Sequence, residues 1–173
     1  MRKKLLALAL LMTIFGMRTS FASPDWKEFY SEAQHFKVLL PTDPKHQAVN
    51  SPLPDGTTTT TDVYTSVNPD GTFYLIAANT FSKEMDVSDT TKILEACLKG
   101  MLVDNTVVVS SQFEEFHGHK TLDFLLKAGT TFQKGKITLV GHSLYDLLYD
   151  YDEKLYNQDE YDRFLQSFNV INR

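Results

Sequence analysis

The chain has 173 residues, of which 42% are apolar and 23% are charged, with eight glycines and six prolines. This composition is typical of a globular protein and excludes collagen-like, low-complexity and wholly disordered chains, while the length favours one domain. The single cysteine, Cys97, excludes a disulfide framework and every zinc motif built on several cysteines.

Residues 1–22 show the three-part pattern of a signal peptide. Three basic residues at positions 2–4 precede an uncharged stretch at positions 5–17, and Ser20 and Ala22 place small residues before a cleavage site. An uncleaved membrane anchor needs roughly 20 apolar residues, and Arg18 interrupts this stretch too early. The sequence therefore predicts a cleaved signal peptide and a mature chain of residues 23–173, which is periplasmic or secreted and has no integral membrane segment.

Cleavage changes the charge balance of the protein. Residues 1–22 contain four basic residues and no acidic ones, so the net charge falls from −5 for the whole chain to −9 for the mature chain. Long-range repulsion from phosphate groups then argues against nucleic acid or an anionic membrane as a partner.

The mature chain is predicted to start with two short strands over residues 26–41, around a turn near Ser31 to Gln34. Pro41 lacks an N–H group and ends the pairing. Residues 41–56 hold four of the six prolines. This density of proline predicts a long loop that is either a surface flap or locally mobile.

The next segments predict a hairpin followed by a helix. Residues 57–67 are rich in β-branched side chains, residues 68–71 form the turn sequence NPDG, and residues 73–80 are almost continuously apolar, as in a strand covered on both faces. Residues 88–104 carry apolar side chains at helical spacing, and Ser88 or Asp89 can cap the start of that helix.

The remaining chain predicts four more strands and a final helix. Asn157 caps this helix, and Glu160 stands where a capping box places its second member. Strand pairs separated by turns, with two single helices, indicate one α+β domain built on an antiparallel sheet. The four predicted strands cover residues 106–116, 120–128, 131–140 and 143–149.

Three short motifs stand out in the chain: FKVLLP at 36–41, GHSLYDL at 141–147 and FLQSF at 164–168. Together they resemble the PsbP/DcrB-like exported proteins of bacteria, whose fold also occurs in the Mog family. The resemblance implies a PsbP-like α/β/α sandwich, an antiparallel sheet flanked by helices, without a catalytic constellation. Members of the family serve as photosystem assembly subunits or as binding proteins, so the resemblance alone selects no function.

His117 and His119 are the metal-ligating candidates. Residues two apart in an extended segment point to the same side, so both imidazoles can bind Zn²⁺ or Cu²⁺. A site needs a third ligand, which Glu114, Glu115 or another histidine can supply. The alternative interpretation is a hairpin turn in which both histidines face water.

Cys97 has two interpretations. An unpaired cysteine in an oxidising compartment suggests a reactive thiol or an intermolecular disulfide. Cys97 also lies on the apolar stripe of the predicted helix, with Ile93, Leu94 and Met101, where a buried thiol behaves as a small hydrophobic side chain. The sequence favours the second interpretation.

An acidic, tyrosine-rich stretch near the C-terminus is the predicted partner surface, because aromatic side chains are enriched at interfaces. Its candidates are Tyr145, Tyr149, Tyr151, Asp150 and Asp152. A cationic or a carbohydrate partner fits such a surface. The acids between positions 146 and 159 lack the ligand spacing of a calcium loop, and we expect them to form a solvated face.

These patterns favour a non-enzymatic binding or assembly-factor module that acts outside the cytosol. Its expected partner is a protein or a small ligand of the cell envelope, and no motif for a cofactor is present. The alternative is a small metal-dependent or hydrolytic enzyme that uses His117 and His119.

Overall fold

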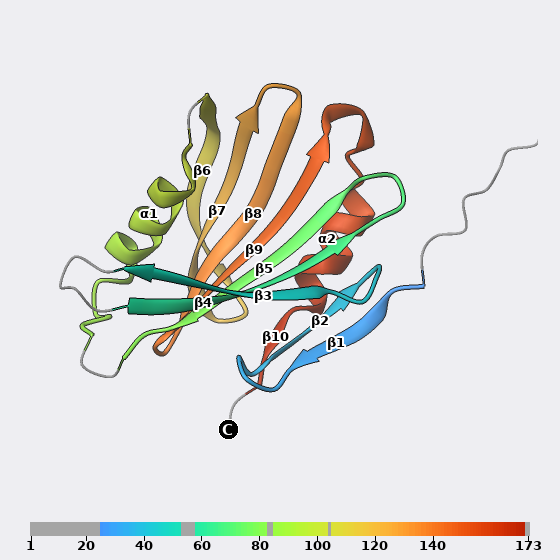
Figure 1. Ribbon diagram of the computed structural model, residues 1–173. Helices are drawn as coiled ribbons and strands as arrows, with labels where there is room; N and C mark the ends of the chain where they lie inside the picture. Colours follow the sequence, from blue (N-terminus) through green and yellow to red (C-terminus); the bar gives the residue numbers. More distant parts are fainter. Residues whose placement is uncertain (1–24, 53–57, 83–84, 104, 172–173) are drawn as a thin grey trace, which may run out of the picture.

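A computed structural model describes residues 25–52, 58–82, 85–103 and 105–171 (Figure 1). Within these ranges the strands form a small and a large sheet, both antiparallel, as the sequence predicts for an α+β domain. The small sheet has the order β1 (Lys27–Ser31), β2 (Phe36–Leu40), β10 (Asn169–Val170). The large sheet has the order β3 (Lys45–Pro52), β4 (Thr58–Val67), β5 (Phe73–Thr80), β9 (Ser143–Asp152), β8 (Thr131–Val140), β7 (His119–Ala128), β6 (Thr106–Phe116).

Two α-helices, α1 (Thr90–Met101) and α2 (Gln158–Ser167), cover different parts of the large sheet (Figure 1). The α1 helix packs on β7 and β8, and α2 packs on β2 of the small sheet. A short 3₁₀ helix, η1 (Glu153–Leu155), connects β9 to α2. None of the helices in the described ranges has the length and apolar character that crossing a membrane requires.

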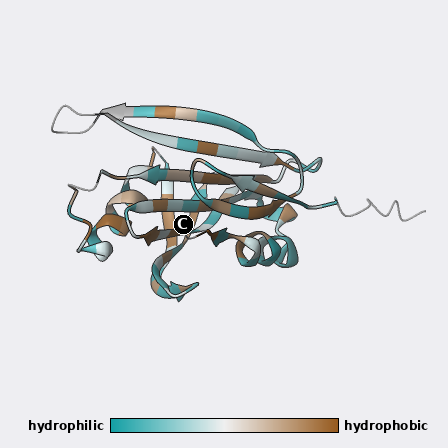
Figure 2. Ribbon diagram, turned by 90° about the horizontal axis from the view of Figure 1, so that it is seen from below, coloured by the Kyte–Doolittle hydropathy of each residue, from teal (hydrophilic) through white to brown (hydrophobic). Residues whose placement is uncertain are grey.

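The two faces of the large sheet bury separate hydrophobic cores. Apolar residues are found along the strands of the large sheet (Figure 2), and successive side chains of a strand point to opposite faces, so a central strand such as β9 contributes Leu147 to one core and Leu148 to the other. The α2-side core combines α2, the small sheet and one face of the large sheet: Trp26, Phe36, Val38, Leu40, Tyr64, Tyr74, Ile76, Ala78, Tyr145, Leu147, Tyr149, Tyr151, Tyr161, Phe164, Leu165 and Phe168. The α1-side core lies on the opposite face: Leu94, Leu98, Leu122, Phe124, Leu126, Ile137, Leu139 and Leu148.

Tight turns fix the register of the hairpins that the sequence predicts. Between β6 and β7, Phe116 pairs with His119, which leaves His117 and Gly118 as a two-residue link. Both link residues have positive φ, 53° and 79°, as a turn matched to the twist of a hairpin requires. This confirms the interpretation of the segment as a hairpin turn.

Residues 45–52 correct the prediction of a loop over 41–56, because they form the edge strand β3, which pairs with β4. Pro44 precedes the strand and Pro52 ends it, so the positions between them keep their N–H groups for the ladder. An edge strand pairs on one side only and therefore tolerates proline at its ends. Residues 53–57 of the predicted loop lie outside the described residues.

The N-terminus of α2 confirms one predicted contact and corrects another. Asn157 is the N-cap, and its side chain accepts hydrogen bonds from the backbone N–H groups of Asp159 and Glu160. The backbone N–H of Asn157 donates to the Tyr149 hydroxyl instead of closing a capping box with Glu160. The Glu160 carboxylate accepts from Tyr74 at 2.8 Å, which ties α2 to the large sheet.

Candidate functional site

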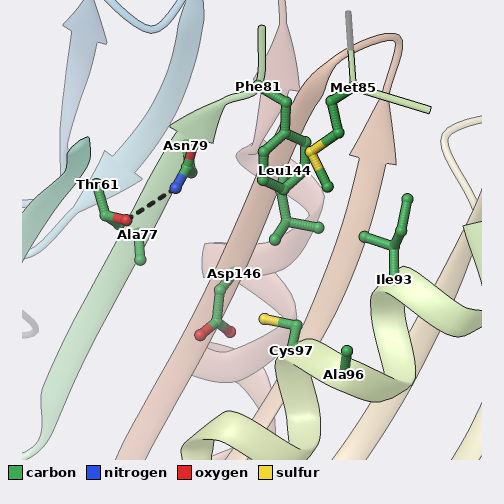
Figure 3. Close-up of a pocket in the computed structure, with 10 residues that line it drawn as sticks. All are labelled: Thr61, Ala77, Asn79, Phe81, Met85, Ile93, Ala96, Cys97, Leu144 and Asp146. Carbon is green, nitrogen blue, oxygen red and sulfur yellow. Dashed lines mark hydrogen bonds between the residues drawn. The ribbon is translucent and has the colours of Figure 1, made fainter. Parts of the chain in front are cut away.

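A cavity of about 360 Å³ lies between α1 and the face of the large sheet at β5 and β9 (Figure 3). Its lining is mostly apolar, with one carboxyl group, one thiol and one amide among the polar groups. The lining residues are Thr61 from β4, Ala77 and Asn79 from β5, Phe81 and Met85 from the segment after β5, Ile93, Ala96 and Cys97 from α1, and Leu144 and Asp146 from β9.

The amphipathic pattern of α1 places one side of the helix over this cavity. Asp89 caps the helix by accepting a hydrogen bond from the backbone N–H of Lys92. Leu94 and Leu98 are buried against the strands of the α1-side core, which turns the neighbouring face of the helix, with Cys97, toward β5 and β9. On the sheet, the short side chain of Ala77 leaves the floor of the cavity unfilled.

Asp146 occupies the middle of the sheet beneath α1. Its cross-strand neighbours are Ala77 on β5 and Ile137 on β8, and Leu144 and Leu148 flank it on its own strand. The Oδ1 atom is buried and has no hydrogen-bond partner among the described residues. Burial raises the pKa of this carboxyl from 3.8 to about 7, because the apolar surroundings disfavour its charged form. The residue keeps partial exposure because it lines the cavity.

The sulfur of Cys97 points toward the Asp146 carboxyl across the cavity (Figure 3). Burial, and then the nearby carboxylate, raise the pKa of the Cys97 thiol to about 12. The group therefore stays protonated at neutral pH and lacks the thiolate that nucleophilic chemistry requires. Cys97 also packs against the α1-side core, so the structure joins the predicted packing role to a position on the cavity wall.

The amide of Asn79 is already engaged. Its Nδ2 donates to the hydroxyls of Thr59 at 2.9 Å and Thr61 at 3.1 Å, and its Oδ1 accepts from Thr59 at 3.0 Å. This network joins β4 to β5 at the edge of the cavity. Asp146 differs from Asn79 in this respect, because its Oδ1 atom has no hydrogen-bond partner among the described residues.

The predicted metal candidates His117 and His119 line a different and smaller cavity, of about 150 Å³, together with Thr138 and Val140. No group of three or more histidine, cysteine, aspartate or glutamate side chains within the described ranges is arranged to hold a metal ion. Glu114, a predicted third ligand, forms an ion pair with Lys136. The fold places His117 and His119 at the same cavity, but no acidic side chain or cysteine among the described residues lines it with them as a third metal ligand.

The predicted partner surface is corrected by the burial of its aromatic members. Tyr145, Tyr149 and Tyr151 all lie in the α2-side core. Asp150 is half-buried and accepts a hydrogen bond from Gln133 at 3.0 Å. Asp152 is exposed, and its carboxylate accepts from the backbone N–H of Lys154. The period of two in β9 explains this result, since it directs the tyrosines to one face and the acids to the other.

Asp146 is the functional candidate that sequence reasoning missed, because the acids from 146 onward were expected to form a solvated face. The available signal was its spacing. Asp146 lies two positions from Leu144 and two from Leu148, so the three side chains point to the same face of the strand. An acid flanked in this way on a strand that is apolar on both faces points to a buried carboxyl.

Comparison with known proteins supports the fold. The solution structure of cyanobacterial PsbP (CyanoP) from Synechocystis sp. PCC 6803 is similar to this chain, with a TM-score of 0.54 and 9% sequence identity. The likeness covers 90% of this chain and 98% of that chain. No protein-family model and no curated protein sequence matches. At 9% identity the likeness concerns architecture, and it establishes that the chain has an α+β, PsbP-like fold.

Proposed function

We propose that this protein is an exported, non-enzymatic binding module of the PsbP/DcrB-like kind, and that the cavity beneath α1 holds a small, largely apolar ligand. The observation that carries the proposal is that Asp146, whose buried Oδ1 atom has no hydrogen-bond partner in the described part of the chain, lines a mostly apolar cavity of about 360 Å³. Ligand cavities in proteins occupy roughly 300–1,000 Å³ and combine apolar walls with a few polar groups that orient the ligand. A volume at the lower end of this range suits a small molecule.

The chemistry of the lining favours binding over catalysis. The cavity offers one carboxyl and one thiol, and the pKa of that thiol is raised to about 12. His117 and His119 line the other cavity with Thr138 and Val140, which alternate along β8 with the Ile137 and Leu139 of the α1-side core. The sheet therefore separates these histidines from Asp146, and no acid–base pair forms across it.

Export is supported by the signal-peptide pattern of residues 1–22 and by the resemblance to exported proteins. Expression of the full chain in a bacterium, followed by fractionation and N-terminal sequencing, tests this part of the proposal. We expect a mature protein in the periplasm or the medium that begins at Ser23. Recovery of an uncleaved chain from the cytosol would contradict export.

A binding experiment with a matched pair of variants tests the cavity. Hexan-1-ol is the probe, because it is small, mostly apolar and carries a hydroxyl that can donate to Asp146. We expect saturable binding to the wild type in an NMR titration, and loss of binding in Ala77→Leu, whose larger side chain fills the floor of the cavity. Ala48→Leu on the exposed edge strand β3 is the control and should bind as the wild type does.

The outcomes of this titration separate the proposal from its alternatives. Equal binding by the wild type and Ala77→Leu would place the ligand elsewhere, and absence of binding to the wild type would reject the cavity as a site for apolar ligands. Elemental analysis of the purified protein addresses the enzyme alternative. A stoichiometric transition metal that is lost in His117→Ala with His119→Ala would favour that alternative.

A further inference from the structure

We propose that the ligand of the cavity beneath α1 is a small apolar amine, whose protonated amino group pairs with the carboxylate of Asp146. This inference rests on the proposed binding function and names the chemical class of the ligand. It follows from what the Asp146 carboxyl lacks, namely a hydrogen-bond partner for its buried Oδ1 atom and a positively charged side chain within the described lining of the cavity.

None of the polar groups in the described ranges that line the cavity with Asp146 donates a hydrogen bond to its Oδ1 atom. Both amide hydrogens of Asn79 have acceptors in Thr59 and Thr61. The thiol of Cys97 is a weak donor, although its sulfur points toward the carboxyl (Figure 3). A buried acceptor without a partner is unfavourable, so a ligand that donates a hydrogen bond to Asp146 removes this unfavourable feature.

A charged donor offsets more of this cost than a neutral one. An amine brings its own positive charge next to the carboxylate, and the attraction is strong because the walls of the cavity are apolar and limit screening. Lys136, a buried cation of the large sheet, does not serve this purpose. Its ammonium group forms ion pairs with Glu114 and Asp123.

Among the described residues that line the cavity, Asp146 is the one carboxyl group, and its protonation state sets the charge of the lining near neutral pH. From β5 it meets Ala77, from β8 Ile137, and on β9 Leu144 and Leu148, none of which titrates. From α1 it meets Cys97, whose pKa of about 12 keeps the thiol neutral. An amine therefore meets a single acidic group within the described lining.

Two further features fit an amine. The mature chain predicted from residues 23–173 has a net charge of −9, and such a charge attracts cations and repels anions over long distances. The remaining lining, from Phe81, Met85, Ile93 and Leu144, suits a short alkyl or aryl group attached to the amine. An acidic ligand of the same size would place two carboxylates side by side.

Titrations with three probes of equal chain length test the inference: hexylamine, hexan-1-ol and hexanoate. At about pH 8 we expect hexylamine to bind at least about tenfold more tightly than hexan-1-ol, and hexanoate to bind most weakly. Because the pKa of Asp146 is about 7, protonation of its carboxyl should weaken hexylamine binding about 30-fold between about pH 8 and pH 5.5. The amine itself stays protonated over this range, as lysine does.

Variants identify the group responsible. Asp146→Asn keeps the shape of the side chain and should remove both the preference for hexylamine and the pH dependence, while hexan-1-ol still binds. Asp152→Asn, at the exposed end of the same strand, should retain both properties. Hexylamine binding that survives in Asp146→Asn would overturn the inference, because it would reflect general attraction to an acidic surface.

The same titrations distinguish failure of this inference from failure of the proposed function. If hexan-1-ol binds as tightly as hexylamine at about pH 8, the amine is rejected and the cavity remains a site for apolar ligands. If none of the three probes binds to the wild type, both the amine and the cavity site are rejected.

Discussion

Replacing Asp146 with asparagine should change how the stability of the protein depends on pH. The pKa of this carboxyl is about 7 in the folded protein, against 3.8 for the ordinary group. Between these values the folded protein keeps a proton that the unfolded chain has released, so the free energy of unfolding falls as the pH rises through this window. Above about pH 7 both states are ionised and the loss is complete.

The size of the effect follows from the two pKa values. At about 1.4 kcal/mol for each tenfold change in the ionisation equilibrium, the difference between 3.8 and about 7 is worth at most about 4 kcal/mol, of which about 3 kcal/mol develops between about pH 4.5 and pH 8. Asparagine does not titrate. The stability of Asp146→Asn relative to the wild type should therefore increase by about 3 kcal/mol across this range.

Urea denaturation at both pH values, with the m-value checked, gives this difference directly. Asp152→Asn is the control, because its side chain is exposed at the end of the same strand, and its difference from the wild type should change by less than about 0.5 kcal/mol. A constant difference between Asp146→Asn and the wild type would refute the reasoning. It would mean that the Asp146 carboxyl is well hydrated in the folded protein and that its surroundings do not disfavour the charged form.

Three other predictions concern packing, hydrogen bonding and thiol reactivity. Gly135→Ala should destabilise the protein by about 3 kcal/mol or more, because a Cβ at this position would lie 2.2 Å from the backbone oxygen of Leu147. Gly100→Ala has open space around the new Cβ and should stabilise α1 by up to about 1 kcal/mol. Thermal denaturation compares the two variants. Tyr74→Phe should cost about 1.5–3 kcal/mol in urea denaturation, because it removes the 2.8 Å hydrogen bond to Glu160, and an unchanged stability would show that this bond contributes nothing. Because the pKa of Cys97 is about 12, this thiol should react with iodoacetamide at about pH 8 roughly 50-fold more slowly than an exposed cysteine. A smaller fraction of Cys97 is thiolate, although each thiolate is more nucleophilic. Mass spectrometry measures the rate, and a rate equal to that of an exposed cysteine would contradict the burial of Cys97.

Local rules account for the elements that the sequence predicts well. The turn at His117 and Gly118 needs two residues that accept positive φ, and the caps at Asp89 and Asn157 need short polar side chains. Each of these features depends on residues within one turn of one another. They therefore leave a clear pattern in the sequence, and the hairpins and both helices could be placed from it.

The parts that the sequence misplaces depend on distant neighbours. The strand β9 is central because β5 pairs with it on the side opposite β8. Asp146 pairs there with Ala77, about 70 residues earlier in the chain, and nothing local to Asp146 shows this pairing. The same pairing buries Tyr145 and Tyr149, although the acids of this stretch suggested an exposed surface. The edge strand β3 was hidden by the prolines at its ends. A carboxyl at the floor of a cavity becomes visible only after α1 and the sheet are placed together.

Mapping the bound probe onto individual backbone amides tests the central claim most directly. A ¹H–¹⁵N NMR titration of the mature protein with hexylamine at about pH 8 should perturb the amides of Ala77, Asn79, Cys97 and Asp146, which surround the cavity beneath α1. Perturbations centred on the hairpin of His117 and His119, or spread evenly over the acidic surface, would contradict the assignment of this cavity as the binding site.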